Sequence, residues 1–290
     1  MSARILTITD ADYFADKILP DTPTLSQSIA KLMLDHSPLH AWANHPRLGN
    51  CAEKESTVAL DDGTLMHHMM LGVGAANVTV IDADNYRTKD AQALRDAALA
   101  AGSTPVLAHK FNALKAGSKM MRDRLADAGV DLDLFDAAQT EAAVLWHEDG
   151  VACRGKMDKL HVERRIIFDV KKSRNAHPMA CARHMLNYGY DLQWAAYTSG
   201  VEALTGAHGE VDMQFIFIED VAPYAVTVGR PDGIMRELGM KKWKKAISTW
   251  KECLASGKWP GYATAPVRLE APTWAISQQM ESEMEDESDE

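Results

Sequence analysis

The segment that most constrains the fold of this chain is residues 151–174, which read VACRGKMDKLHVERRIIFDVKKSR. Val151–Leu160 and Arg165–Val170 read as strands, because residues Val151–Asp158 and Ile166–Lys171 each divide into an apolar and a charged face, and a period of two is typical of β-strands with one buried face. A further strand-like run, Ala142–Trp146, precedes them across Asp149-Gly150, a pair that favours a tight hairpin turn. The segment therefore predicts an antiparallel meander of three strands.

This hairpin carries two carboxylates and an ammonium group. Asp169 and Lys171 fall on one face of the second strand. If the turn centres on Glu163-Arg164, Asp158 lies opposite Asp169, with the Cβ atoms roughly 4.5–5.5 Å apart. Two carboxylates this close repel each other unless a cation lies between them, and ligands that are all oxygen suit Mg²⁺ or Mn²⁺. The alternative interpretation is a solvated strand face with ordinary ion pairs.

The remainder of the chain alternates between helix-like and strand-like segments. Helical spacing and capping residues predict helices over Thr24–Leu34, a short stretch towards His45-Pro46, Asp61–Leu71, Tyr86–Ala101, Ala108–Ala128, Pro178 to about Leu204, and Ile234–Ala255. Strand texture returns at Val211–Ile218 and Tyr224–Val228. We find no internal repeat and no Gly/Ser linker. The order predicts one α/β domain with a mixed sheet flanked by helices.

Charge and cysteine content narrow the class of protein. The net charge is −10, and seven of the 41 acidic residues lie in the last ten, which predicts a disordered acidic tail. The four cysteines form no Cys-x-x-Cys pair, so we expect reduced thiols and neither disulfides nor a zinc site. Residues 1–20 lack the apolar run of a signal peptide, and nowhere do about 18 apolar residues follow one another. These features predict a soluble intracellular protein.

The hairpin resembles the active-site hairpin of the PD-(D/E)XK nuclease superfamily, and within it the RecB-like and RecE-like (exodeoxyribonuclease VIII type) phage and prophage exonucleases. Met157-Asp158 stands where that family has Pro-Asp or a similar pair. Asp169-Val170-Lys171 matches the Asp/Glu-x-Lys signature. Gln193 and Tyr197, in QWAAY, match the Gln-xxx-Tyr motif of the RecB-like branch. The resemblance extends over most of the chain and implies a restriction-endonuclease-like sheet core.

Two further motifs lie upstream of the hairpin. Gly63 and His67 match the Gly-xxx-His motif of the same branch, and one helical turn separates them. A packed or surface histidine is the alternative for His67, and His68 competes for the role. Glu141 stands where these enzymes often carry a further acidic residue, and an ordinary strand-end carboxylate is its alternative.

The resemblance implies a role for each matched residue. Mg²⁺, with Mn²⁺ able to substitute, would be held by His67, Asp158, Asp169 and the carbonyl of Val170. Lys171 would assist the attacking water, and the site would be supported by Glu141, Gln193 and Tyr197. No iron–sulfur cluster is expected, because the cysteines do not flank the core in the pattern of the iron–sulfur nucleases.

Basic residues surround the predicted site. Eight Lys and Arg against three acidic residues lie between Arg154 and Arg174, which suits contacts with phosphates. Arg154 and Lys156 are expected to share the charged strand face with Asp158, and we predict DNA contacts by Arg154, Lys156, Lys172 and Arg174. A second cluster, in residues 241–245, is interpreted as a solvated helix face.

The resemblance implies a Mg²⁺-dependent exonuclease in the cytoplasm of a bacterial host cell. It would hydrolyse linear double-stranded DNA, 5′ to 3′, in phage-type recombination or DNA repair. A ring-shaped homo-oligomer and a single-strand annealing protein are the implied partners. The alternatives are a structure-specific endonuclease of the same fold and a catalytically silent DNA-binding or assembly protein. We expect an N-terminal helical segment (1–50) packed on a nuclease domain (51–275), followed by the acidic tail (276–290).

Overall fold

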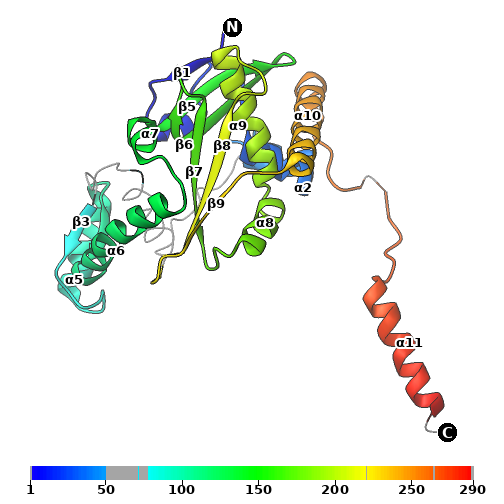
Figure 1. Ribbon diagram of the computed structural model, residues 1–290. Coiled ribbons are helices and arrows are strands. Elements are labelled where there is room, and N and C mark those ends of the chain that lie inside the picture. The colour runs from blue at the N-terminus through cyan, green and yellow to red at the C-terminus, as the bar shows by residue number, and fades with distance from the viewer. Residues whose placement is uncertain (1, 50–70, 72–77, 220, 264, 289–290) are drawn as a thin grey trace.

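A mixed sheet of seven strands forms the centre of the computed structural model, which describes residues 2–49, 71, 78–219, 221–263 and 265–288 (Figure 1). Six strands follow one another in the order β1 (Arg4–Leu6), β5 (Gln139–Glu148), β6 (Val151–His161), β7 (Ile166–Ser173), β8 (Asp212–Glu219) and β9 (Val226–Gly229). The short β2 (Leu25–Ser26) pairs with β6 in parallel. The predicted mixed sheet flanked by helices is confirmed.

The predicted meander is present as β5, β6 and β7, and these strands are antiparallel. Asp149 and Gly150 have φ angles of 50° and 83°, as a tight turn between twisted strands requires. Leu160 pairs with Ile167, which is the predicted register of the second hairpin. Local alternation and turn chemistry therefore predicted this part of the sheet correctly.

Strand β8 extends the meander into a mixed sheet, because it runs parallel to β7. A parallel neighbour needs a crossover connection, and helices α8 (Pro178–Asn187) and α9 (Tyr190–Thr205) supply it. Along β8, Phe215 and Phe217 face one core, whereas Ile216 and Ile218 face the other. Since both faces are covered, this strand reads as a nearly continuous apolar run.

The larger core lies between the sheet and a helical layer made of α2 (Gln27–Asp35), α3 (Pro38–Asn44), α8, α9 and α10 (Gly233–Ser256). Its largest fully buried side chains include Trp146 of β5 with Trp243 and Trp250 of α10. A smaller core on the opposite face joins Phe168 of β7 to Phe135. It is covered by α6 (Ala108–Asp127) and α7 (Leu132–Ala137).

The single helix predicted from Pro178 to about Leu204 is wrong. Gly189 separates α8 from α9 and has a φ angle of 72°, in the left-handed region that favours glycine. A Cβ at this position would also lie 2.9 Å from Cε of Lys31. After this break, α9 begins at Tyr190 and packs against the sheet as a separate helix.

Several short elements were not predicted. The N-terminal segment contributes α1 (Asp10–Phe14) and the strands β1 and β2, so part of it belongs to the central sheet. A separate pair of parallel strands, β3 (Val78–Ile81) and β4 (Thr104–Leu107), is connected by α5 (Lys89–Ala100). Strands of two to four residues give only a weak pattern, although the four-residue β9 was predicted within Tyr224–Val228.

The acidic C-terminal segment forms α11 (Thr273–Ser288), which Figure 1 shows beyond an extended stretch and away from the sheet. The disorder expected for residues 276–290 stays a prediction. Met, Gln, Ala and Glu favour helix even where like charges repel.

Of the predicted helix Asp61–Leu71, only Leu71 lies within the described residues, and its side chain is buried. Among the described helices, none has the combined length and apolarity to cross a lipid bilayer.

Candidate active site

Strands β6 and β7 bring Asp158 and Asp169 together where their pairing ends. The last pair of the ladder towards the site is Lys159 with Phe168, so Asp158 and Asp169 would form the next. Instead, Oδ2 of Asp158 accepts a hydrogen bond from the backbone N–H of Val170 at 2.7 Å. The carboxylate of Asp158 thus stands between the two strands, beside Asp169.

The facing pattern of β6 changes at Asp158. Met157 and Leu160 both contribute to the larger core, although strict alternation would place them on opposite faces. On the neighbouring strand, Glu141 has a φ angle of 53°, and the β5–β6 ladder omits the Glu141–Asp158 pair. The predicted alternation from Val151 to Asp158 is present, since Val151, Cys153 and Met157 all contribute to the larger core. Beyond it, both strands reverse their faces at these two carboxylates. A left-handed residue other than glycine is uncommon, and here it interrupts the ladder and redirects the neighbouring side chains.

Asp169 is held from two sides. It is 1% exposed, and its Oδ1 lies 2.5 Å from Nζ of Lys171. Its Oδ2 accepts a hydrogen bond of 2.6 Å from Nε2 of Gln193, a buried residue of α9. Burial alone would lower the pKa of Lys171, but the carboxylates of Asp169 and then Asp158 outweigh it and raise the pKa. Lys171 is therefore an ammonium group that serves as a donor.

Helix α9 presents a polar and aromatic stripe to the site. Tyr190, Gln193 and Tyr197 are spaced by three and four residues, so they lie on one helical face. Nζ of Lys171 lies 4.6 Å from the ring centroid of Tyr190, within the range of cation–π attraction. Tyr190 was not predicted from the sequence, although its spacing from Gln193 and Tyr197 is a signal that could have identified it.

Tyr197 fixes the backbone of β6 next to the site. Its hydroxyl donates a hydrogen bond of 2.8 Å to the carbonyl of Lys156. Burial raises the pKa of Tyr197 well above its ordinary value, so the hydroxyl keeps its proton. Gly155 gives the ring its space, because a Cβ there would lie 3.1 Å from Cε1 of Tyr197. Gly155 is a second site residue that was not predicted.

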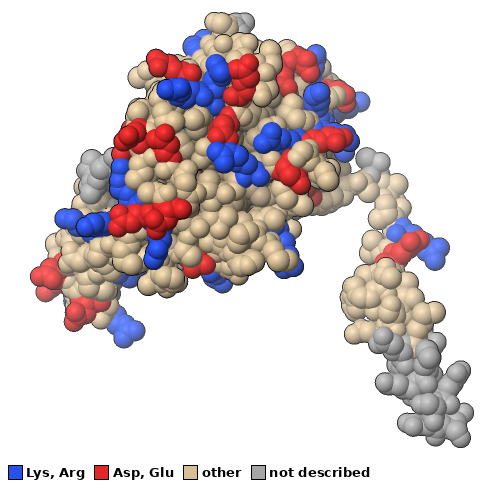
Figure 2. All heavy atoms as spheres, viewed as in Figure 1, with Lys and Arg blue, Asp and Glu red and all other residues tan. Residues whose placement is uncertain are grey.

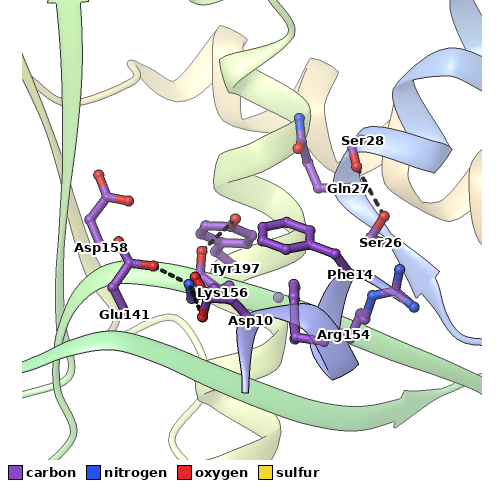
Figure 3. A pocket seen from close by; sticks show the side chains of 12 residues that line it. Asp10, Phe14, Ser26, Gln27, Ser28, Glu141, Arg154, Lys156, Asp158 and Tyr197 are labelled. Atoms are coloured by element: carbon purple, nitrogen blue, oxygen red, sulfur yellow. Dashed lines mark hydrogen bonds and ion pairs between the residues drawn. The ribbon is translucent and has the colours of Figure 1, made fainter. Parts of the chain in front are cut away.

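Glu141 and Asp158 line a cavity of about 520 Å³ beside this cluster (Figure 3). Nζ of Lys156 lies 2.5 Å from Oε2 of Glu141 and 2.9 Å from Oδ1 of Asp10 in α1. Burial alone would lower the pKa of Lys156, but these two carboxylates raise it. Lys156 therefore links β6 to α1 and β5 through its charge.

Arg154 lies inside the protein. The residue is 4% exposed, its guanidinium is ion-paired with Asp16, and it donates a hydrogen bond of 2.7 Å to Oγ1 of Thr24. The ring of Tyr13 lies 5.4 Å from Cζ of Arg154. These contacts commit Arg154 to the fold, so its buried position does not support the predicted contact with DNA.

Fewer of the eight lysine and arginine residues between Arg154 and Arg174 are exposed than the sequence led us to expect. Lys159 is buried beside the ring of Phe135, and Arg165 is ion-paired with Glu210. Lys172 and Arg174 are exposed at the end of β7. On the face of the molecule seen in Figure 2, basic and acidic side chains are interspersed. Of the eight cations in residues 154–174, three are exposed, namely Arg164, Lys172 and Arg174.

The donors at the site fit a hard divalent cation. Asp158, Asp169 and the Val170 carbonyl form the all-oxygen set that Mg²⁺ and Mn²⁺ prefer. His67, the remaining predicted ligand, lies outside the described residues, as does Gly63. Over the described part of the chain, no group of three or more His, Cys, Asp or Glu is placed to hold an ion by itself. In the described part of the chain, the cysteines Cys153, Cys181 and Cys253 are buried and form no disulfide bond.

Comparisons with known proteins agree with this geometry. Residues 26–266 match the family model described as "PDDEXK-like domain of unknown function (DUF3799)". The fold resembles the crystal structure of a putative exonuclease from Eubacterium rectale, with a TM-score of 0.56 and 12% sequence identity. That match covers 92% of this chain and 96% of the other. No curated protein matches the sequence.

The family match spans most of the chain and includes every part of the hairpin and of α9 that builds the site. The structural match extends over nearly the full length of both proteins and shows a common fold. The chain therefore belongs to the PDDEXK-like family DUF3799 and has the fold of the PD-(D/E)XK nucleases.

Proposed function

We propose that the protein is a divalent-metal-dependent exonuclease that hydrolyses phosphodiester bonds of linear double-stranded DNA. The observation that carries this proposal is the buried carboxylate of Asp169, held between Lys171 and Gln193 and beside Asp158. Burying a charge is costly unless it is paired. A fold without a catalytic role would gain little from gathering two carboxylates and a lysine at the point where two strands separate.

In the proposed reaction, Asp158, Asp169 and the Val170 carbonyl hold Mg²⁺, and His67 is the proposed fourth ligand. When bound, the ion supplies positive charge that stabilises the negative charge developing on the phosphate. Mn²⁺ is expected to substitute, because it accepts the same oxygen ligands.

The side chains around the ion have separate tasks. Lys171 is an ammonium group, so it donates a hydrogen bond to the attacking water or to a phosphate oxygen and stabilises its charge. Gln193 orients the carboxylate of Asp169, and Tyr197 fixes the strand that bears Asp158. Glu141 of β5 holds the ammonium group of Lys156 in β6 through an ion pair. Lys172 and Arg174 are exposed, and they are the proposed contacts to the DNA backbone.

The finer parts of the proposal are supported by the sequence resemblance. They comprise 5′ to 3′ polarity, a ring-shaped homo-oligomer, and action beside a single-strand annealing protein in phage-type recombination or repair. A cytoplasmic location in a bacterial cell belongs with this role. The printed name of the Eubacterium rectale protein favours an exonuclease over an endonuclease.

One assay tests the proposal. Purified protein is incubated with linear and with covalently closed circular duplex DNA, in Mg²⁺ or in EDTA. We expect loss of the linear DNA alone, and only with the metal. Cleavage of the circle would indicate a structure-specific endonuclease. Binding without cleavage in Mg²⁺ or Mn²⁺ would indicate a catalytically silent DNA-binding protein and would refute the enzyme.

A further inference from the structure

The cavity beside Asp158 has the size and position of a substrate pocket. Its volume of about 520 Å³ lies within the range of roughly 300–1,000 Å³ that is common for small-ligand sites. It is bounded by α1, the start of α2, and the strands β5 and β6. Since Asp158 lines it, the cavity adjoins the proposed metal site.

The wall of the cavity is aromatic. Phe14, at the end of α1, is 63% exposed although it is large and apolar, and its ring faces the cavity in Figure 3. Tyr13 packs edge-on against Phe14, with ring centroids 5.4 Å apart. Tyr197 adds a further ring to the lining. Exposed aromatic rings beside a nucleic-acid path commonly stack on unpaired bases.

The charge of the cavity suits a neutral ligand better than a phosphate. Its lining carries two cations against the three carboxylates of Asp10, Glu141 and Asp158. Both cations, Lys156 and Arg154, already pair with carboxylates. The start of α2 is capped as well, because Ser26 Oγ accepts a hydrogen bond of 3.4 Å from the N–H of Ile29. An anion would find little uncompensated positive charge here.

The far side of the cavity carries neutral polar groups. Gln27 is half-buried there and brings an amide, which has both donors and an acceptor. Ser28 lies beside it, and its hydroxyl is 3.1 Å from Oγ of Ser26. Amides and hydroxyls recognise the edges of bases through hydrogen bonds. The cavity thus combines a stacking surface with groups that read a base edge.

We propose that this cavity binds the unpaired base of the nucleotide next to the scissile phosphate, stacked on Phe14 and with its edge towards Gln27 and Ser28. The inference rests on the proposed function for its substrate class and deepens it. A base can enter only after leaving its own stack, so the protein would act on a terminal nucleotide that is frayed or single-stranded. Phe14 is then a specificity-determining residue, separate from the metal-binding cluster.

A binding experiment tests the pocket without requiring cleavage. A single-stranded oligonucleotide with an internal fluorophore is titrated with protein in EDTA, and fluorescence anisotropy gives the affinity. Two further oligonucleotides carry an abasic nucleotide at the 5′ or the 3′ end. For the intact protein, we expect the missing base at one of the two ends to weaken binding about tenfold, the effect of losing one base–aromatic stack.

Variants assign that effect to Phe14. Phe14→Ala should bind the intact oligonucleotide about tenfold more weakly and show no further loss with the abasic one. Phe14→Trp should restore the affinity and the preference for a base. Trp274→Ala removes an aromatic side chain of similar exposure (66% against 63%) from α11, and we expect it to leave binding unchanged.

Equal affinity of the intact protein for all three oligonucleotides would overturn the inference. So would an equal loss by Phe14→Ala on intact and abasic ends, since Phe14 would then act independently of the base. The nuclease assay separates these failures from failure of the proposed function. A protein that cleaves linear DNA but ignores the terminal base keeps its function and lacks this pocket, whereas one that prefers the base but never cleaves DNA keeps the pocket and loses the function.

Discussion

Asp16 and Asp169 are both buried carboxylates that face a cation, and they differ in the groups that surround them. Asp16 accepts hydrogen bonds from the backbone N–H of Thr24 at 2.9 Å and from its hydroxyl at 2.5 Å. It also pairs with Arg154, and Nε2 of His45 lies 3.4 Å away. Its side chain is 0% exposed, and that of Arg154 is 5% exposed. Donors surround this carboxylate on every side.

Asp169 has a different kind of surroundings. Its partners include the ammonium of Lys171 and the amide of Gln193, and the Lys171 side chain is 18% exposed. Asp158 lies next to it as a second carboxylate. A divalent cation between these two carboxylates would relieve their mutual repulsion. The comparison teaches that a single carboxylate paired with a buried arginine serves stability, whereas two adjacent carboxylates beside a lysine suit a metal and a substrate.

The largest expected effect is on stability, at Asp16. Asp16→Ala should lower the free energy of unfolding by about 3–5 kcal/mol, because it leaves Arg154 buried without its counter-charge. Urea denaturation measures this. Asp136→Ala, which breaks the exposed pair with Arg122, is the control and should cost about 1 kcal/mol or less. Similar losses in the two variants would contradict the structural role of the enclosed pair.

The next effect is on catalysis, at Lys171. Lys171→Ala should lower the turnover of linear DNA about 10²–10³-fold, because one preorganised donor to the reacting groups is lost. Single-turnover rates in Mg²⁺ measure the loss, and thermal unfolding checks the fold. Lys172→Ala removes an exposed lysine at the next position and should weaken DNA binding only modestly. Retained turnover in Lys171→Ala would show that another residue supplies the charge.

A smaller effect is expected at Gln193. Gln193→Leu removes the hydrogen bond to Asp169 and should raise the Mg²⁺ concentration for half-maximal activity about 10–100-fold. Gln214→Leu is a matched control, since Gln214 is also buried and donates to another carboxylate, Asp212. A metal requirement that rises equally in the two variants would indicate general loosening of the sheet rather than orientation of Asp169.

The smallest effect appears only in acid. Burial alone would raise the pKa of Asp16, but hydrogen bonds and charge from His45, Arg154 and Thr24 outweigh it and lower the pKa below the ordinary 3.8. The ionised form therefore adds stability that is complete above the unfolded pKa and is lost as the pH falls through the folded pKa.

Asp16→Asn sharpens this prediction. The difference in unfolding free energy between the intact protein and Asp16→Asn should stay constant from pH 7 to about pH 5 and shrink below about pH 4. Unfolding in urea at a series of pH values measures it. A difference that persists unchanged to pH 3, or that already shrinks near pH 6, would mean that another group governs the acid response.

Much of the sheet was predictable because its signals are local. Strand texture in Ala142–Trp146, Val151–Leu160 and Arg165–Val170, with the Asp149-Gly150 turn, predicted the strands β5, β6 and β7. The register followed from the position of the second turn. The short strands β3 and β4 were missed because four residues give too weak a pattern. The break at Gly189 was missed because an isolated glycine within a helical pattern is often tolerated.

The candidate site was predictable in its chemistry and less so in its arrangement. The spacing of Gln193 and Tyr197 indicated one helical face, which the structure shows. The burial of Arg154 could not be read from the sequence, since its partner Asp16 lies 138 residues away. Nor could the reversal of faces at Asp158, which depends on the left-handed backbone of Glu141 in the neighbouring strand.

By itself, the sequence determined the three-strand meander, its register, and the residues that chemistry would require, Asp158, Asp169 and Lys171. These depend on periodicity and on residue type, which are local properties. Only the tertiary structure decided which charges are available at the site. Ion pairs form between segments distant in sequence, so the fold assigned Arg154 to a closed internal pair and left the Asp169 cluster beside an open cavity.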